Sequence, residues 1–97
     1  MAKYYLTNKA VDDISEIWNY TIETWSEMQA EKYYDLLLAS CDDLANNPEL
    51  GKNYGIVTKG ILGFKSGEHI IFYSIISKNE IEVARILHGM MDLKSKL

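Results

Sequence analysis

Several residue types are scarce in this chain, and each shortage excludes a class of protein. Its 97 residues include one cysteine, Cys41, and one proline. A lone cysteine cannot form an internal disulfide, which agrees with a reducing cytosol. No apolar run reaches the ~18 residues of a membrane span, and the first residues lack the apolar core of a signal peptide. We therefore expect one domain over residues 1–97, located in the cytoplasm and away from membranes.

Positive charge is also scarce in the first half of the chain. Residues 8–46 carry nine acids against Lys9 and Lys32, a local balance of −7, whereas residues 47–97 carry seven bases against five acids, a balance of +2. The acidic half would repel a phosphate backbone, and the basic excess elsewhere is small. We expect no direct binding of nucleic acid, and we interpret the acids first as the solvated faces of helices.

Residue patterns that would carry metal or covalent chemistry are missing. The histidines are His69 and His88, and neither has a cysteine or a second histidine at ligand spacing. Cys41 lies on an apolar helical face, and no Gly-x-Ser-x-Gly or Cys/His pairing is visible. The glycines form no phosphate-binding loop before a helix. The sequence therefore predicts no metal site and no catalytic nucleophile.

The first forty-six residues predict a short strand and two helices. Lys3–Leu6 is a strand candidate, and Asn8 is a good N-cap for the helix that follows. The acids of this helix fall mostly off its apolar face, which we expect to consist of Val11, Ile14, Trp18, Ile22 and Trp25.

The second helix has clear start and stop signals. Ser26 with Gln29 reads as a capping box, and Asn46-Asn47-Pro48 ends the helix because proline cannot continue it. The apolar face of this helix is predicted to hold Ala30, Tyr33, Tyr34, Leu37, Leu38, Cys41, Leu44 and Ala45. So few residues separate the two helices that they should form an antiparallel hairpin.

The remainder of the chain predicts strands at 61–66, 69–76 and 80–87, with Gly63 as a possible bulge or bend. The connection at 77–79 is short enough for a β-hairpin. Strand 69–76 is apolar at nearly every position, which is typical of a central strand or of one covered by a partner. The predicted fold is α+β in the order β-α-α-β-β-β. An N-terminal strand and a helical hairpin precede a three-stranded antiparallel sheet, and the hairpin lies on one face of that sheet.

Motifs across the whole chain resemble the ParE-type toxins, which are paired with ParD antitoxins in bacterial type II toxin–antitoxin modules. The opening strand leads into Lys9-Ala10-Val11-Asp12-Asp13-Ile14, and Asn47-Pro48-Glu49-Leu50-Gly51 is similar to the loop that follows the family's second helix. The most specific segments are Gly67-x-His69-Ile70-Ile71-Phe72-Tyr73 and Arg85-Ile86-Leu87-His88-Gly89-x-Met91-Asp92.

The resemblance implies a toxin that binds and inhibits DNA gyrase, catalyses no reaction, needs no cofactor and is held in a hetero-oligomer by a ParD-like antitoxin. It implies that the target is contacted by Tyr73, Arg85, His88, Met90, Met91, Asp92, Leu93 and Leu97. It also implies an apolar antitoxin groove, for which we expect Tyr20, Tyr34, Phe64, Ile70 and Phe72.

Two other functions stay open at this point. Ser74 and Met90 stand where family members often have arginine, whose planar contacts neither residue can replace. A non-toxic protein that only binds its antitoxin is therefore one alternative. The other is a RelE-like endonuclease that cuts messenger RNA on the ribosome. Such cleavage needs a base, an acid and cations, for which the candidates are Tyr73, His88 and Arg85.

Overall fold

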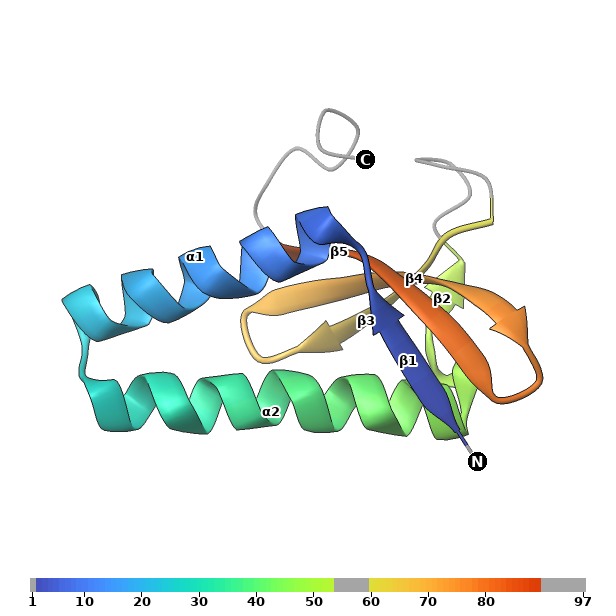
Figure 1. Ribbon diagram of the computed structural model, residues 1–97, viewed down its shortest axis with the longest axis horizontal. Coiled ribbons are helices and arrows are strands. Elements are labelled where there is room, and N and C mark those ends of the chain that lie inside the picture. Colours follow the sequence, from blue (N-terminus) through green and yellow to red (C-terminus); the bar gives the residue numbers. More distant parts are fainter. Residues whose placement is uncertain (1, 54–59, 90–97) are drawn as a thin grey trace.

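A helical hairpin packs against a mixed β-sheet in the computed structural model, which describes residues 2–53 and 60–89 (Figure 1). In these residues the order is strand, two helices, a 3₁₀ turn and four strands, so the α+β prediction is confirmed. The elements are β1 (Lys3–Leu6), α1 (Asn8–Thr24), α2 (Glu27–Asn46), η1 (Pro48–Leu50), β2 (Lys52–Asn53), β3 (Leu62–Ser66), β4 (His69–Ser77) and β5 (Glu80–His88).

The described strands form one sheet in the order β1-β5-β4-β3-β2, which places β4 at its centre as expected. β5 pairs with β4 in antiparallel register and with β1 in parallel register, from Lys3 opposite Glu80 to Leu6 opposite Val83. The N-terminal strand is thus part of the same sheet as the four later strands. The sequence analysis missed β2. This strand has two residues, Lys52 and Asn53, and neither is of a type that is common in strands.

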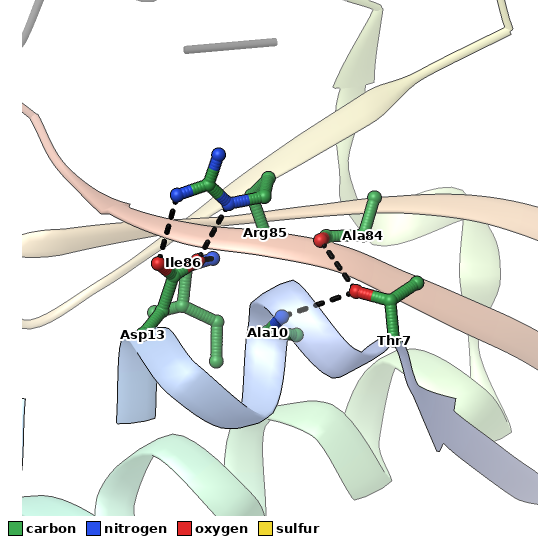
Figure 2. Close-up of polar contacts among 6 residues, drawn as sticks. All are labelled: Thr7, Ala10, Asp13, Ala84, Arg85 and Ile86. Atoms are coloured by element: carbon green, nitrogen blue, oxygen red, sulfur yellow. Dashed lines mark hydrogen bonds and ion pairs between the residues drawn. The ribbon is translucent and has the colours of Figure 1, made fainter. Parts of the chain in front are cut away.

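The helix ends follow local hydrogen-bonding rules, with one correction. Thr7, and not Asn8, is the N-cap of α1: its Oγ1 accepts from the Ala10 N–H at 3.1 Å and donates to the Ala84 carbonyl of β5 at 2.8 Å (Figure 2). A threonine at this position can therefore cap the helix and tie it to the sheet at once. The predicted Ser26 cap is confirmed by the Gln29 N–H at 3.0 Å, and α2 ends at Asn46.

The buried face of α1 is rotated from the predicted one. The inward side chains are Ala10, Asp13, Ile14 and Thr21, with Ile17 partly buried. Three of the five expected core residues are exposed instead, at 46% for Val11, 39% for Ile22 and 72% for Trp25. Hydrophobicity alone selected the larger side chains, but the adjacent stripe, which includes the small residues Ala10 and Thr21, is the one that faces α2 and the sheet.

The buried face of α2 matches the prediction more closely. Ala30, Leu37, Cys41, Leu44 and Ala45 are all buried, and they meet the inward side chains of β4 and β5 in one core. Tyr33 and Leu38 lie partly buried at its edge, whereas Tyr34 is 38% exposed. Burial raises the pKa of the Cys41 thiol to about 12, which makes this cysteine a core residue and not a reactive one.

The irregular positions of the sheet do not lie at Gly63, where the sequence suggested a bulge or bend. Gly63 pairs regularly with Phe72 on one side and Lys52 on the other, so the expected bulge there is wrong. The register shifts lie between β4 and β5, at Phe72/Tyr73 and at Ile75/Ser77. Neither position holds a glycine. A bulge needs an extra residue in one strand, and that residue does not have to be a glycine.

No helix within residues 2–53 and 60–89 combines the length and the apolar character that crossing a membrane requires.

A buried tyrosine hydroxyl ties η1 to the centre of the sheet. Tyr73, fully buried in β4, donates from its hydroxyl to the Pro48 carbonyl at 2.6 Å and accepts from the Gly51 N–H at 3.0 Å. Gly51 lies so close to the phenol that a Cβ there would overlap the ring. The hydroxyl therefore satisfies two backbone groups that would otherwise be left without partners.

We predict that Tyr73→Phe lowers the free energy of unfolding by about 1–3 kcal/mol, because it leaves the Pro48 carbonyl and the Gly51 N–H unsatisfied in a buried place. Urea unfolding at pH 7 measures this. Tyr5→Phe is the matched control, since the exposed Tyr5 hydroxyl donates only to Glu80. Equal losses in the two variants would contradict the proposed role of the Tyr73 hydroxyl.

Candidate functional site

One buried carboxylate joins the first helix to the last strand of the sheet. Asp13 of α1 accepts from Arg85 Nε at 2.8 Å, from Arg85 Nη2 at 2.9 Å and from the Ile86 N–H at 3.0 Å (Figure 2). The side chains are 8% exposed for Asp13 and 19% for Arg85. The hydrogen bond to Asp13 raises the pKa of Arg85 further above its usual value. This is a bidentate ion pair that also satisfies a backbone donor.

The buried position of Asp13 corrects the sequence interpretation, which placed it among the solvated acids. The residue lies three positions after Ala10 and directly before Ile14, on the stripe that faces the sheet. A carboxylate on that stripe requires a cationic partner. Arg85, alone of its type in the chain, was the signal that could have identified the partner.

A second polar cluster lies where β4 begins and β5 ends. His69 and His88 are cross-strand partners, and their ring centroids are 5.4 Å apart at 81°. The Tyr33 hydroxyl of α2 lies 2.6 Å from His69 Nδ1 and accepts from the Glu68 N–H at 2.9 Å. Gly67, with φ of 60°, turns the chain so that the Tyr33 ring can lie against this turn.

The geometry of this cluster favours a neutral His69. With its hydroxyl accepting from Glu68, Tyr33 can donate its own proton to Nδ1, which places the His69 proton on Nε2. Desolvation lowers the pKa of His69, and the neighbouring His88 lowers it as well, whereas Glu68 and Asp13 oppose the shift. The described residues hold no group of three or more potential metal ligands, so the histidine pair has no third ligand among them.

The residues expected to contact the target fall into three places. Arg85 and His88 both belong to the last four residues of β5. Tyr73 is fully buried, and its hydroxyl is engaged by η1, so a direct contact from this residue is a correction to the expected site. Met90, Met91, Asp92, Leu93 and Leu97 lie outside the described residues.

The three residues considered for RNA cleavage do not meet. Tyr73 follows His69 by four positions on β4, and His69 is paired with His88, so Tyr73 and His88 are roughly 13 Å apart along the sheet. Arg85 is held by Asp13.

The residues expected to receive the antitoxin are split between the helices and the sheet. Tyr20 and Tyr34 are exposed on the hairpin, at 64% and 38%. Phe64 and Ile70 are partly buried in β3 and β4, and Phe72 is fully buried. Burial removes Phe72 from any direct contact, because its side chain already packs inside the protein.

The helical hairpin is nevertheless the most apolar exposed region described. Most of the large exposed apolar side chains belong to it: Val11, Tyr20, Ile22, Trp25, Met28, Tyr34 and Leu36. Trp18, half-buried, meets Tyr34 edge to face with ring centroids 5.8 Å apart. These two rings, with Glu31 and Asp35, line an open depression of about 500 Å³ between the helices. The sequence analysis had assigned Trp18 to the core.

Comparison with known proteins agrees with the fold and with the motifs at the end of β5. Residues 4–93 match the model of a family described as the ParE toxin of the type II toxin–antitoxin system, parDE. The chain belongs to the ParE toxin family. Two curated relatives are each named Toxin ParE1. That of Mycobacterium tuberculosis is 32% identical over 96 residues, covering 99% of this chain and 98% of the relative. That of Caulobacter vibrioides is 30% identical over 97 residues, covering 100% and 99%.

A solved structure shows the same fold. It is described as the chromosomal ParDE TA system from P. aeruginosa and superposes with a TM-score of 0.76 at 17% identity, covering 91% of this chain and 96% of that one. The fold of this ParE-family chain is therefore shared by a protein of very different sequence.

We predict that Asp13→Asn lowers the free energy of unfolding by about 2–3 kcal/mol, because Arg85 loses its counter-charge in a mostly buried place. Asp12→Asn removes the same charge from the adjacent exposed position and should cost less than ~0.5 kcal/mol. Chemical denaturation of both variants measures the difference. A loss for Asp13→Asn no larger than that of the control would contradict the structural role of the pair.

We also predict that acid weakens the fold through His69. Because its pKa is lowered in the folded state, the unfolded chain binds more protons as the pH falls below the ordinary value of 6.5. The free energy of unfolding should fall from pH 7.5 to pH 5 and level off once the folded-state pKa is passed. His69→Asn keeps a hydrogen-bond acceptor near Tyr33 but cannot titrate, so its stability should depend less on pH in that window. An unchanged slope would argue that other groups cause the pH dependence.

Proposed function

We propose that this ParE-family toxin inhibits DNA gyrase by binding it and is neutralised by a ParD-like antitoxin that covers the helical hairpin. The observation that carries the antitoxin contact is the set of large apolar side chains left exposed on the helical hairpin, which include Tyr20 at 64% and Trp25 at 72%. Exposed apolar surface of this kind is typical of a protein–protein contact. An amphipathic segment that folds against it would cover a large area.

The proposed target contact begins at the end of β5. Arg85 and His88 occupy the end of β5, and the sequence continues into Met90, Met91, Asp92, Leu93 and Leu97. Methionine side chains suit adaptable binding surfaces. The ion pair with Asp13 fixes the Arg85 guanidinium, and in the proposal this fixed charge supports the contact with the target. Antitoxin and target then use different parts of the toxin.

Binding without catalysis is the mechanism that the geometry favours. Tyr73 is buried and hydrogen-bonded to Pro48 and Gly51, so its phenol is withheld from acid–base chemistry. Burial also raises the pKa of Tyr73. A proton donor or acceptor must reach the reacting atom of its substrate, which this residue does not. We accordingly propose a non-enzymatic toxin that acts in the cytoplasm, where gyrase works.

Expression of the chain alone in bacteria tests this proposal. We expect growth arrest, inhibition of gyrase supercoiling by the purified protein, and relief of both by the product of the neighbouring reading frame. Met90→Ser with Met91→Ser should weaken gyrase inhibition and leave antitoxin binding intact. Tyr20→Ala, the matched control on the hairpin, should weaken antitoxin binding and leave gyrase inhibition intact.

Three outcomes would overturn parts of this proposal. Arrest with cut transcripts and unaffected supercoiling would indicate the RelE-like ribonuclease. Normal growth with retained antitoxin binding would indicate a non-toxic member. If each variant loses both gyrase inhibition and antitoxin binding while circular dichroism shows that it is still folded, target and antitoxin share one surface.

A further inference from the structure

The depression between the helices combines an aromatic wall, an apolar floor and a charged rim. Trp18 and Tyr34 form the wall, and Glu31 and Asp35 line the same space. Beneath it the helices close on one another: a crevice too narrow for water is lined there by Ile14, Ile17, Trp18, Thr21, Ala30, Tyr34 and Leu37. The Thr21 hydroxyl on that seam is already bonded to the Ile17 carbonyl at 2.7 Å. The floor thus offers apolar contact and no free hydroxyl from Thr21.

Neither carboxylate forms an ion pair within residues 2–53 and 60–89. The ion pair found in those residues joins Asp13 to Arg85 and uses neither Glu31 nor Asp35. Glu27, Glu31 and Asp35 follow one another at four-residue spacing, so like charges lie side by side along one edge of α2. Like charges at this spacing destabilise a helix. The isolated chain therefore presents like charges side by side at the edge of the depression, and Lys32, three residues before Asp35, forms no ion pair with either of them in the described residues.

We propose that this depression receives a cationic side chain, arginine foremost, from the antitoxin segment that covers the hairpin; this rests on the antitoxin contact proposed above. The aliphatic stem of the side chain lies on the apolar floor. The guanidinium lies against the Trp18 and Tyr34 rings, where cation–π attraction is strongest for arginine and indole. Glu31 and Asp35 accept its N–H groups and lose their mutual repulsion.

The chemistry selects arginine over other occupants. A purely apolar side chain would fill the floor but would desolvate two carboxylates without a partner, which is costly. A lysine carries a compact, strongly hydrated charge that cannot stack on the rings or span both carboxylates as a planar fork does. Charge complementarity acts over a longer range as well, because residues 8–46 carry a net −7.

Binding of N-acetyl-arginine amide to the ¹⁵N-labelled chain tests the site without any antitoxin. We expect the Trp18 indole N–H to shift on titration, while the exposed Trp25 indole serves as the internal reference. N-acetyl-citrulline amide has nearly the same shape without the charge, and its shift should be at least about fivefold smaller. Equal shifts from both compounds, or shifts confined to Trp25, would overturn the proposal.

A pair of double variants tests the same site in the complex. Glu31→Gln with Asp35→Asn should raise the dissociation constant of the neighbouring-frame antitoxin roughly threefold to tenfold. Glu23→Gln with Asp42→Asn removes the same charge from exposed positions outside the depression and should change it less than about twofold. The variant Glu31→Gln with Asp35→Asn should also raise the melting temperature of the isolated toxin slightly. If these carboxylates instead stabilised the fold, the melting temperature would fall.

Failure of this inference is distinguishable from failure of the proposed function. Antitoxin binding that is unaffected by Glu31→Gln with Asp35→Asn, with toxicity and neutralisation intact, would refute the arginine site alone. If the antitoxin does not bind the wild-type chain, the proposed neutralisation is refuted. The proposal that the antitoxin supplies the arginine is then refuted as well. The response to N-acetyl-arginine amide would still decide whether the depression is a cation site.

Discussion

The carboxylate of Asp13 is the constraint on which the arrangement of the layers depends. Three N–H groups of Arg85 and Ile86 converge on it, so α1 cannot slide or rotate against β5 without leaving a buried charge unpaired. Apolar packing between a helix and a sheet is non-directional and would tolerate several rotations of the helix. The ion pair selects one of them, and that rotation turns Val11, Ile22 and Trp25 outward.

Other polar contacts hold the helical layer to the sheet at separate points. Thr7 joins the start of α1 to β5, Tyr33 joins α2 to the turn before β4, and the hydroxyls of Ser40 and Ser66 meet at 2.7 Å in a buried place. Every buried side-chain polar atom in the described residues has a hydrogen-bond partner. Since satisfied polar contacts specify one geometry and unsatisfied ones are costly, the hairpin is held in a defined position over the sheet.

The sequence predicted the elements well and their orientations less well. The Ser26 cap, the proline stop and the turn at 77–79 are local signals, and each of them is confirmed. The inward face of α1 depends on a residue seventy-two positions away, Arg85, and periodicity within the helix could not reveal it. The candidate site was affected in the same way. Phenylalanine and tyrosine are common at interfaces, but Phe72 and Tyr73 are both fully buried in this fold.

The rotation of α1 explains why a small toxin can leave bulky aromatic residues in water. The core is complete without Trp25 and Tyr20, because Ala10, Ile14 and the apolar stripe of α2 already close it. The exposed rings and the acidic edge of α2 therefore contribute little to folding and are open to selection for binding. A surface that carries several like charges gains most when a partner of opposite charge covers it. Any ligand that binds this face of the folded chain, and not the unfolded chain, would accordingly raise its stability.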